Sequence, residues 1–189
     1  MSKPKLLIVV ASTRPGRVGR PVTDWFRRVA VEHGGFQVEE VDLFDLDLPL
    51  LDEPNHPRLQ QYTQEHTRAW SAEIDAADAF VFVTPEYNHS YPASLKNAVD
   101  YLHQEWRHKA LGFVSYGGIA AGTRAVQAFK LVAGALMMYV ASNLVNIAFV
   151  HSKIADGVFV EDKDVRAAAD AMLDELLELN RALSALREA

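Results

Sequence analysis

The chain has 189 residues, of which 49% are hydrophobic and 23% charged, and its formal net charge is −6. This length fits a single domain over residues 1–189, and the acidic balance argues against nucleic acid as a partner, because a phosphate backbone requires a broad basic surface. The sequence contains no cysteine, which excludes disulfides, thiolate nucleophiles, iron–sulfur clusters and zinc fingers.

Short apolar segments alternate with helical patterns along the chain. Residues 5–11 (KLLIVVA) lack the polar alternation of a half-exposed strand and predict a fully buried one. Further strands are expected at residues 36–43, 79–84, 110–115 and 144–150. Helices are expected at residues 20–33, 62–77, 92–103 and 123–139, and from residue 164 onward, with a long loop at residues 43–57. This alternation predicts an α/β fold with a doubly wound, five-stranded parallel sheet and helices on both faces.

An apolar stretch at residues 131–150 is long enough to raise the question of a membrane span. Ser142, Asn143 and Asn146 interrupt it, and its pattern changes from helix-like to strand-like near Ala141. A helix that runs into a buried strand is the better interpretation. The apolar run near the start of the chain is too short for a signal peptide, so we expect a soluble, cytoplasmic protein.

Positive charge is concentrated near the start of the chain. Residues 1–30 hold seven of the 19 Lys and Arg residues and a single acid, Asp24. Three of these arginines lie in ASTRPGRVGR, residues 11–20, at the end of the first expected strand. Hydroxyls, backbone amides, a helix N-terminus and guanidinium groups are together what a phosphate needs. The segment predicts a phosphate site, with a solvated turn as the alternative; its candidate residues are Ser12, Thr13, Arg14, Arg17, Val18 and Gly19.

Two more loops follow the third and fourth expected strands, and parallel sheets bind ligands at the carboxyl ends of their strands. The first of these loops offers backbone donors and a flat surface to a planar ligand through Pro85, Glu86, Tyr87 and Asn88. The second contains paired glycines that allow close approach of a ligand, and its candidates are Ser115, Tyr116, Gly117 and Gly118. Each loop alone could be only a turn. Together the three predict a site for a phosphorylated, planar aromatic ligand.

Other kinds of site find little support in the sequence. It contains no G-x-x-x-x-G-K-[ST] motif, and the first loop lacks G-x-G-x-x-G. Asp45 and Asp47 lie among prolines and are interpreted as loop residues. Lys96 and Asp100 are interpreted as a solvated ion pair on a helix, and the seven histidines show no metal-ligand spacing.

The Ser-x-Arg loop, the segment PEYNHSYPASLKNAVDYL (residues 85–102) and the SYGG segment (residues 115–118) together resemble the NADPH-dependent FMN reductases of flavodoxin-like fold. The resemblance covers residues 5–150. It implies that Ser12, Arg14 and the turn through Gly19 hold the FMN phosphate. Residues 85–88 would then lie against the isoalloxazine ring, and residues 115–118 would line its pyrimidine side. Ala11 stands where the family usually has glycine, and we expect its methyl group to be tolerated.

The resemblance implies an oxidoreductase in which FMN accepts hydride from NAD(P)H, with NADPH preferred. Electrons would then pass to a small acceptor, either a flavin, a quinone, an azo compound or a metal oxyanion. We expect no essential acid or base side chain, because the cofactor carries the reaction. The alternative is an electron carrier or FMN-binding module without NAD(P)H oxidation of its own, although a carrier usually has a strongly acidic docking face.

Assembly into a homodimer or homotetramer is also expected from the resemblance. Tyr91, Tyr101 and Trp106 follow the second candidate loop, and aromatic residues of this kind are enriched at interfaces. Burial of these side chains within one subunit is the alternative. The shared motifs leave open the physiological acceptor, the choice between NADPH and NADH, and how tightly FMN is bound.

Overall fold

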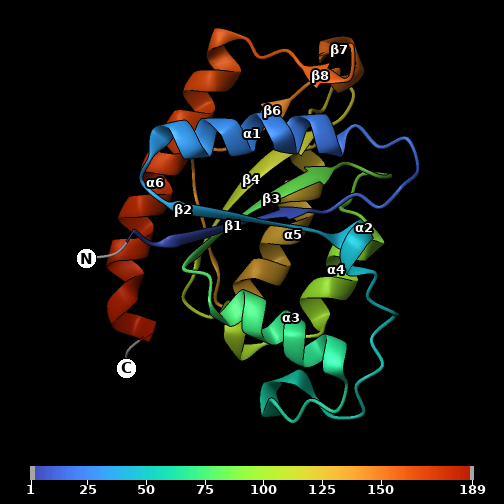
Figure 1. Cartoon of the computed structure of the whole chain (residues 1–189), viewed down its shortest axis with the longest axis vertical. Helices are drawn as coiled ribbons and strands as arrows, with labels where there is room; N and C mark the ends of the chain where they lie inside the picture. The colour runs from blue at the N-terminus through green and yellow to red at the C-terminus, as the bar shows by residue number, and fades with distance from the viewer. Residues whose placement is uncertain (1–2, 188–189) are drawn as a thin grey trace.

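A parallel sheet forms the centre of the protein, and the computed structural model describes residues 3–187 (Figure 1). The order of the strands is β2-β1-β3-β4-β5, and β6 pairs with β4 beyond the end of β5. The chain passes from β1 to β2 on one side and then to β3 on the other, so the strand order reverses between β1 and β3. The strands are β1 (Lys5–Val10), β2 (Gln37–Asp42), β3 (Ala79–Pro85), β4 (Ala110–Tyr116), β5 (Tyr139–Val140) and β6 (Val145–Ile147).

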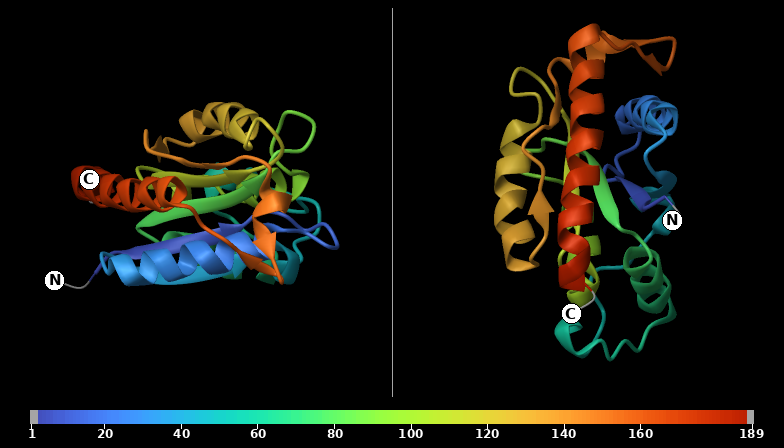
Figure 2. Two further views of the ribbon diagram at one scale, coloured as in Figure 1. Left: turned by 90° about the horizontal axis from the view of Figure 1, so that it is seen from above. Right: turned by 90° about the vertical axis from the view of Figure 1, so that its left-hand side faces the viewer.

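Helices cover both faces of this sheet, as predicted. One face carries α1 (Gly19–His33) and α6 (Lys163–Arg187), and the other carries α3 (Glu65–Asp75), α4 (Ala93–Asp100) and α5 (Thr123–Ala135). Figure 2 shows α1 and α5 on opposite sides of the strands. The shorter elements are α2 (Leu43–Leu46), three 3-10 turns at Pro57–Leu59, Gln104–Trp106 and Val150–Lys153, and the hairpin of β7 (Ile154–Ala155) and β8 (Val158–Phe159).

The two faces of the sheet bury different side chains because successive residues of a strand point in opposite directions. In β1, Leu6 and Ile8 pack with α1 and α6, whereas Leu7 and Val9 pack with the three helices of the other face. All four are less than 2% exposed. Burial on both faces explains why this strand reads as an unbroken apolar run.

The single fifth strand predicted at residues 144–150 is wrong in its extent. Two short strands, β5 and β6, share that edge, and the first of them begins where a helix was expected. The backbone between them turns away from the ladder, and the amides of Ser142 and Asn143 donate to the carboxylate of Glu175 on α6 at 2.7 Å each. A contact from the last helix therefore splits the strand.

Three of the expected helices are also longer in the prediction than in the structure. The helices α3, α4 and α5 end before the positions expected for them, and the loop expected at residues 43–57 opens with the short helix α2. The apolar stretch 131–150 contains the end of α5, β5 and β6, which confirms a helix that leads into strand structure. No helix within residues 3–187 combines the length and apolar character needed to cross a membrane.

The aromatic side chains proposed for an interface lie mostly in the core. Tyr101 and Trp106 are 0% exposed. The Tyr101 hydroxyl donates to Asp52, and the Trp106 indole donates to the carbonyl of Val99. The interpretation of these two residues as interface residues is wrong, because both find their partners within one chain.

A buried carboxylate anchors the segment that leads into α3. Glu105 is 2% exposed and accepts hydrogen bonds from Ser71 at 2.7 Å, Tyr62 at 2.7 Å and Gln60 at 3.3 Å. Burial raises the pKa of Glu105, but the hydrogen bonds from Ser71, from its own backbone amide, and from Tyr62 and Gln60 together outweigh burial and hold that pKa below its ordinary value. The charged form is therefore the one that the fold stabilises.

Glu105→Gln is expected to lower the free energy of unfolding by about 1–3 kcal/mol at neutral pH, because the amide leaves a buried hydrogen-bond network incomplete. The pKa of Glu105 is lower in the folded than in the unfolded protein. The charged carboxylate therefore contributes its full stabilisation at a pH above the pKa of the unfolded state, and this contribution is lost as the pH falls through the pKa of the folded state. Urea denaturation should show that the difference in free energy of unfolding between wild type and Glu105→Gln becomes smaller as the pH is lowered through this range. Glu178→Gln, on the exposed face of α6, is the control, and equal stabilities of wild type and Glu105→Gln at neutral pH would contradict the assignment.

Candidate functional site

A cavity of about 480 Å³ opens at the carboxyl end of the sheet, which is within the usual size range of small-molecule sites. It lies between the loops that follow β1, β3 and β4, so the three loops predicted to share this edge do meet here. A fourth segment, after β6, completes the wall. The lining residues are Arg14, Arg17, Val18, Pro85, Glu86, Tyr87, Tyr116, Gly117, Gly118, Phe149, Val150, His151 and Ser152.

The loop after β1 contains a tight turn at residues 14–17. The amide of Arg17 donates to the carbonyl of Arg14 at 3.1 Å, and Gly16 has a φ of 70°, in the left-handed region that favours glycine. Proline followed by glycine at the centre of a turn is typical of type II geometry. The Pro-Gly pair at the centre of Arg-Pro-Gly-Arg therefore explains why this segment forms a turn.

Several backbone amides of this loop are available to a ligand. Within residues 3–187, the N–H groups of Ser12, Thr13, Arg14 and Val18 have no hydrogen-bond acceptor, and the N-terminus of α1 has no side-chain cap. Unpaired amides at a helix N-terminus attract an anion. The loop therefore supplies the donors that a phosphate group requires.

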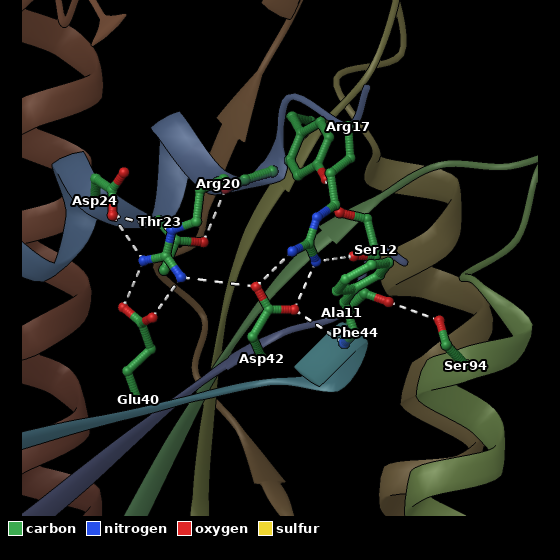
Figure 3. Close-up of polar contacts among 12 residues, drawn as sticks. Ala11, Ser12, Arg17, Arg20, Thr23, Asp24, Glu40, Asp42, Phe44 and Ser94 are labelled. Carbon is green, nitrogen blue, oxygen red and sulfur yellow. Dashed lines mark hydrogen bonds and ion pairs between the residues drawn. The ribbon is translucent and has the colours of Figure 1, made fainter. Parts of the chain in front are cut away.

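Two of the three arginines near this loop are paired with carboxylates of β2 (Figure 3). Arg17 forms a two-pronged ion pair with Asp42, at 2.5 and 2.8 Å. Arg20 binds Glu40 at 2.5 and 2.8 Å and also contacts Asp24 on its own helix. Arg14 is exposed and forms no ion pair in the described part of the chain. It is the guanidinium group at this site whose hydrogen-bonding capacity is left for a ligand.

The base of the same loop is closely packed against β4. Ser12 is 1% exposed and its hydroxyl accepts a hydrogen bond from Tyr116 at 3.1 Å. Burial raises the pKa of Tyr116, so this hydroxyl keeps its proton. A Cβ atom on Gly19 would lie 2.5 Å from both the Ser12 Oγ and the Tyr116 Oη. Only glycine fits at the start of α1 without displacing this contact.

The loop after β3 is fixed from two directions. The Glu86 carboxylate accepts hydrogen bonds from the Arg124 side chain at 2.9 Å and from its backbone amide at 3.1 Å, at the start of α5. Tyr87 and Ser90 exchange backbone hydrogen bonds, and Asn88 sits at the tip of that turn with a φ of 49°. Asn88 is not among the lining residues, whereas Pro85, Glu86 and Tyr87 are in the wall.

The loop after β4 is hydrogen-bonded to the segment after β6, which forms the remaining part of the cavity wall. The amides of Phe149 and Val150 donate to the carbonyls of Gly118 and Gly117, each at 3.1 Å. Phe149 is 58% exposed and adopts a φ of 49°, an unusual value for a bulky residue. The expectation of a strand through Val150 concealed this segment, and no motif marks it.

The structure places the predicted site residues in two groups. Nine of them line the cavity: Arg14, Arg17, Val18, Pro85, Glu86, Tyr87, Tyr116, Gly117 and Gly118. The other five lie outside the wall. Ser12, Gly19 and Ser115 are buried behind it, Asn88 is on the exposed turn, and Thr13 faces a second hollow beside α2 and α4.

The cavity fits FMN by the chemistry of its parts. At one end lie Arg14 and Val18, whose amides have no acceptor within residues 3–187, beside the N-terminus of α1, and these groups suit a phosphate. At the other end Pro85, Tyr87 and the two glycines leave open surface, since a Cβ on Gly118 would meet no atom within 4 Å. FMN, in which a phosphate is linked to a flat ring, matches these two different ends of the cavity.

Comparison with known proteins agrees with this chemistry. The model of the NADPH-dependent FMN reductase family matches residues 4–152. The chain belongs to that family. It is therefore an oxidoreductase flavoenzyme of the kind that uses FMN and NAD(P)H.

Individual proteins of known kind are similar to this chain over most of their length. The chain is 45% identical over 157 residues to an NAD(P)H-dependent FMN reductase of Schizosaccharomyces pombe, which covers 82% of this chain and 78% of the relative. It is 36% identical over 197 residues to an NAD(P)H-dependent FMN reductase of Nectria sp, covering 93% and 96%. The flavoenzyme NAD(P)H:(acceptor) oxidoreductase FerB of Paracoccus denitrificans superposes with a TM-score of 0.72 at 21% identity, over 93% and 98% of the chains, and shows the shared fold.

Gly19→Ala is expected to destabilise the protein by about 1–3 kcal/mol, the usual range for an overpacked site, because its methyl group would press on Ser12 and Tyr116. Thermal unfolding without flavin measures this effect apart from cofactor binding. Gly118→Ala is the matched control, since its methyl group would enter open space. The same melting temperature for both variants would contradict the packing derived for this loop.

Proposed function

We propose that this family member binds FMN in the cavity described above and passes electrons from NAD(P)H to a small acceptor. The observation that carries the proposal is the meeting of a phosphate-type loop with two loops of open surface at one edge of the sheet. When bound, FMN supplies the ring that accepts hydride, and the protein binds and orients both partners. The acceptor class, whether flavin, quinone, azo compound or metal oxyanion, is left open.

The cofactor phosphate would bind to the loop 12–19 chiefly through its backbone. The hydroxyl of Ser12 accepts a hydrogen bond from Tyr116 and keeps its own proton to donate. The amides of Arg14 and Val18, which line the cavity, would provide contacts together with the side chain of Arg14. Gly19 would allow the start of α1 to approach closely. Arg17 would contribute as part of the wall while its charge remains paired with Asp42.

The isoalloxazine ring would lie against the other two loops. Residues 85–88 would contact one side of it through Pro85, Glu86 and Tyr87, with Asn88 at the turn beyond. Residues 115–118 would face the pyrimidine side, where Ser115 and Tyr116 support Gly117 and Gly118. Backbone donors placed near the developing negative charge of the ring favour its reduction. We expect no essential acid or base side chain.

The direct test of this function is the absorption spectrum of the purified protein after addition of FMN, with NAD(P)H oxidation followed in parallel. A shifted flavin spectrum with turnover is the expected result, and the absence of both would overturn the proposal. Stopped-flow mixing with NADPH separates the enzyme from an electron carrier, because a carrier would leave its FMN oxidised.

The structure provides no free side chain of Arg17 or Arg20 to favour NADPH over NADH. Arg17 and Arg20 are the further arginines near the site that could bind the additional phosphate of NADPH, but both guanidinium groups are bound to carboxylates. The preference now rests on the family's description as NADPH-dependent. A comparison of kcat/KM for the two nucleotides decides it.

Arg14→Ala is expected to weaken FMN binding by about 1.5–3 kcal/mol, the scale of a charge-assisted hydrogen bond. Fluorescence titration of the apoprotein measures this loss. Arg28→Ala, an exposed arginine on α1, is the control and should bind FMN as the wild type does. Unchanged affinity in Arg14→Ala would show that the phosphate lies elsewhere.

We further propose a cytoplasmic homodimer, or a dimer of such dimers, in which one subunit covers the cavity of the other. The rim of the cavity supports this proposal, because the lining residues Tyr87 and Phe149 are 37% and 58% exposed, and Ile119, next in the chain to the lining residue Gly118, is 80% exposed. An isologous contact would repeat this surface on both partners.

Light scattering of the purified protein is expected to give a mass of at least twice 21.0 kDa. The physical reason is that exposed apolar side chains around the cavity gain free energy when a second copy removes them from water. A mass of 21.0 kDa at micromolar concentration with full activity would end the dimer proposal.

A further inference from the structure

Asp42 is a buried carboxylate at the carboxyl end of β2, outside the wall of the cavity. Its side chain is 5% exposed. Both of its oxygens bind Arg17, and one of them also accepts a hydrogen bond from the amide of Phe44 at 3.0 Å, where it caps α2. Nothing in the flavin chemistry requires a carboxylate at this position, so its contacts call for a separate explanation.

Arg17 is held on three sides by groups of the protein. Besides Asp42, its Nη1 donates to the carbonyl of Ser12 at 2.5 Å, and its guanidinium carbon lies 4.8 Å from the centre of the Phe44 ring (Figure 3). The side chain is 16% exposed and runs along the wall of the cavity. Arg17 therefore joins the end of the loop to its beginning and ties both to β2.

This tie fixes the part of the chain that carries the free amides. The hydrogen bond from Arg17 closes the loop over Ser12, Thr13 and Arg14, whose N–H groups have no acceptor within residues 3–187. Amides held in place before binding cost less conformational entropy when a ligand arrives. A lysine could not replace the arginine, because the two-pronged contact needs a planar fork.

The neighbouring pair provides a contrast within the same network. Arg20 and Glu40 form an equally close ion pair, but Arg20 is 36% exposed and makes no contact with the backbone of the loop. Glu40 lies two residues before Asp42 on β2. The two pairs are linked, because Arg20 Nη1 also lies 3.7 Å from Asp42 Oδ2, but only the Arg17–Asp42 pair holds the loop closed through Ser12.

We propose that Asp42 is a positioning residue for the cofactor phosphate: it holds Arg17 against Ser12 and so keeps the loop 12–19 in the form that presents its free amides. This inference rests on the proposed binding of FMN. It assigns Asp42 no contact with the cofactor. It predicts that Asp42 matters for the phosphate group and little for the flavin ring.

The test compares FMN with riboflavin, which has the same ring and no phosphate. Apoprotein of the wild type, Asp42→Asn and Glu40→Gln is titrated with each flavin by fluorescence quenching. Asp42→Asn is expected to lose about tenfold in affinity for FMN, the scale of one or two lost hydrogen bonds to a charged group, with a change below about twofold for riboflavin. Glu40→Gln is expected to bind both flavins as the wild type does.

Two results with Asp42→Asn would overturn the inference. An equal loss for FMN and riboflavin would mean a general structural role, and an unchanged or higher affinity for FMN would mean that the loop needs no such tie. If Asp42→Asn does not fold by circular dichroism, Arg17→Lys takes its place, because it keeps the charge and removes the fork; the same selective loss is expected. A wild type that binds neither flavin would overturn the proposed function itself, which is a different outcome from wild-type binding that the variants leave unchanged.

Discussion

The register of β1, β3 and β4 is the constraint on which the site depends. Backbone pairing continues just past the ends of these strands: the amide of Ala11 donates to Val83 at 3.0 Å, and the amide of Glu86 donates to Tyr116 at 3.1 Å. Each loop therefore leaves the sheet at nearly the same level. Ser12 and Tyr116, which are 104 residues apart in the sequence, can form a hydrogen bond because the ladder has already brought them together. The order of the strands at their switch point then leaves room for a ligand.

Burial decides which positive charges of the loop remain for a ligand. An unpaired charge removed from water is costly, so a partly buried arginine needs an anionic partner. Arg17, at 16% exposure, has Asp42, whereas the exposed Arg14 is solvated without one. A chain with a net charge of −6 can thus keep a local positive charge at the loop where we propose the phosphate to bind. Its carboxylates neutralise the arginines that shape the loop and leave free the one that faces the solvent.

The parts of the fold and the site that could be predicted are those encoded by neighbouring residues. Unbroken apolar runs such as residues 5–11 marked the buried strands, and Pro15 with Gly16 marked a turn. The three loops could be placed at one edge because parallel strands end on the same side. These features need only local sequence and the general geometry of a parallel sheet.

The features that were missed depend on contacts between distant residues. The carboxylate that splits the fifth strand, Glu175, belongs to the last helix. Asp42 is 25 residues from Arg17, and no spacing rule links them. Phe149 reaches the cavity only because its amide binds Gly118. Charge near a loop could be read from the sequence, but the partner of each charge could not.

The two ends of the cavity are built in different ways, and this difference bears on how it can select its ligands. The end where we propose the phosphate to bind has unpaired backbone donors in a loop that buried contacts hold. The other end includes Tyr87 and Phe149, which are exposed and largely apolar. A site that hydrogen-bonds one group rejects molecules that lack it, whereas an apolar surface discriminates only weakly between flat molecules of similar size. If FMN binds as proposed, strict recognition of its phosphate can therefore coexist with a broad choice of partners for the ring. This division also explains why a sequence that defines the phosphate loop so clearly does not define the electron acceptor.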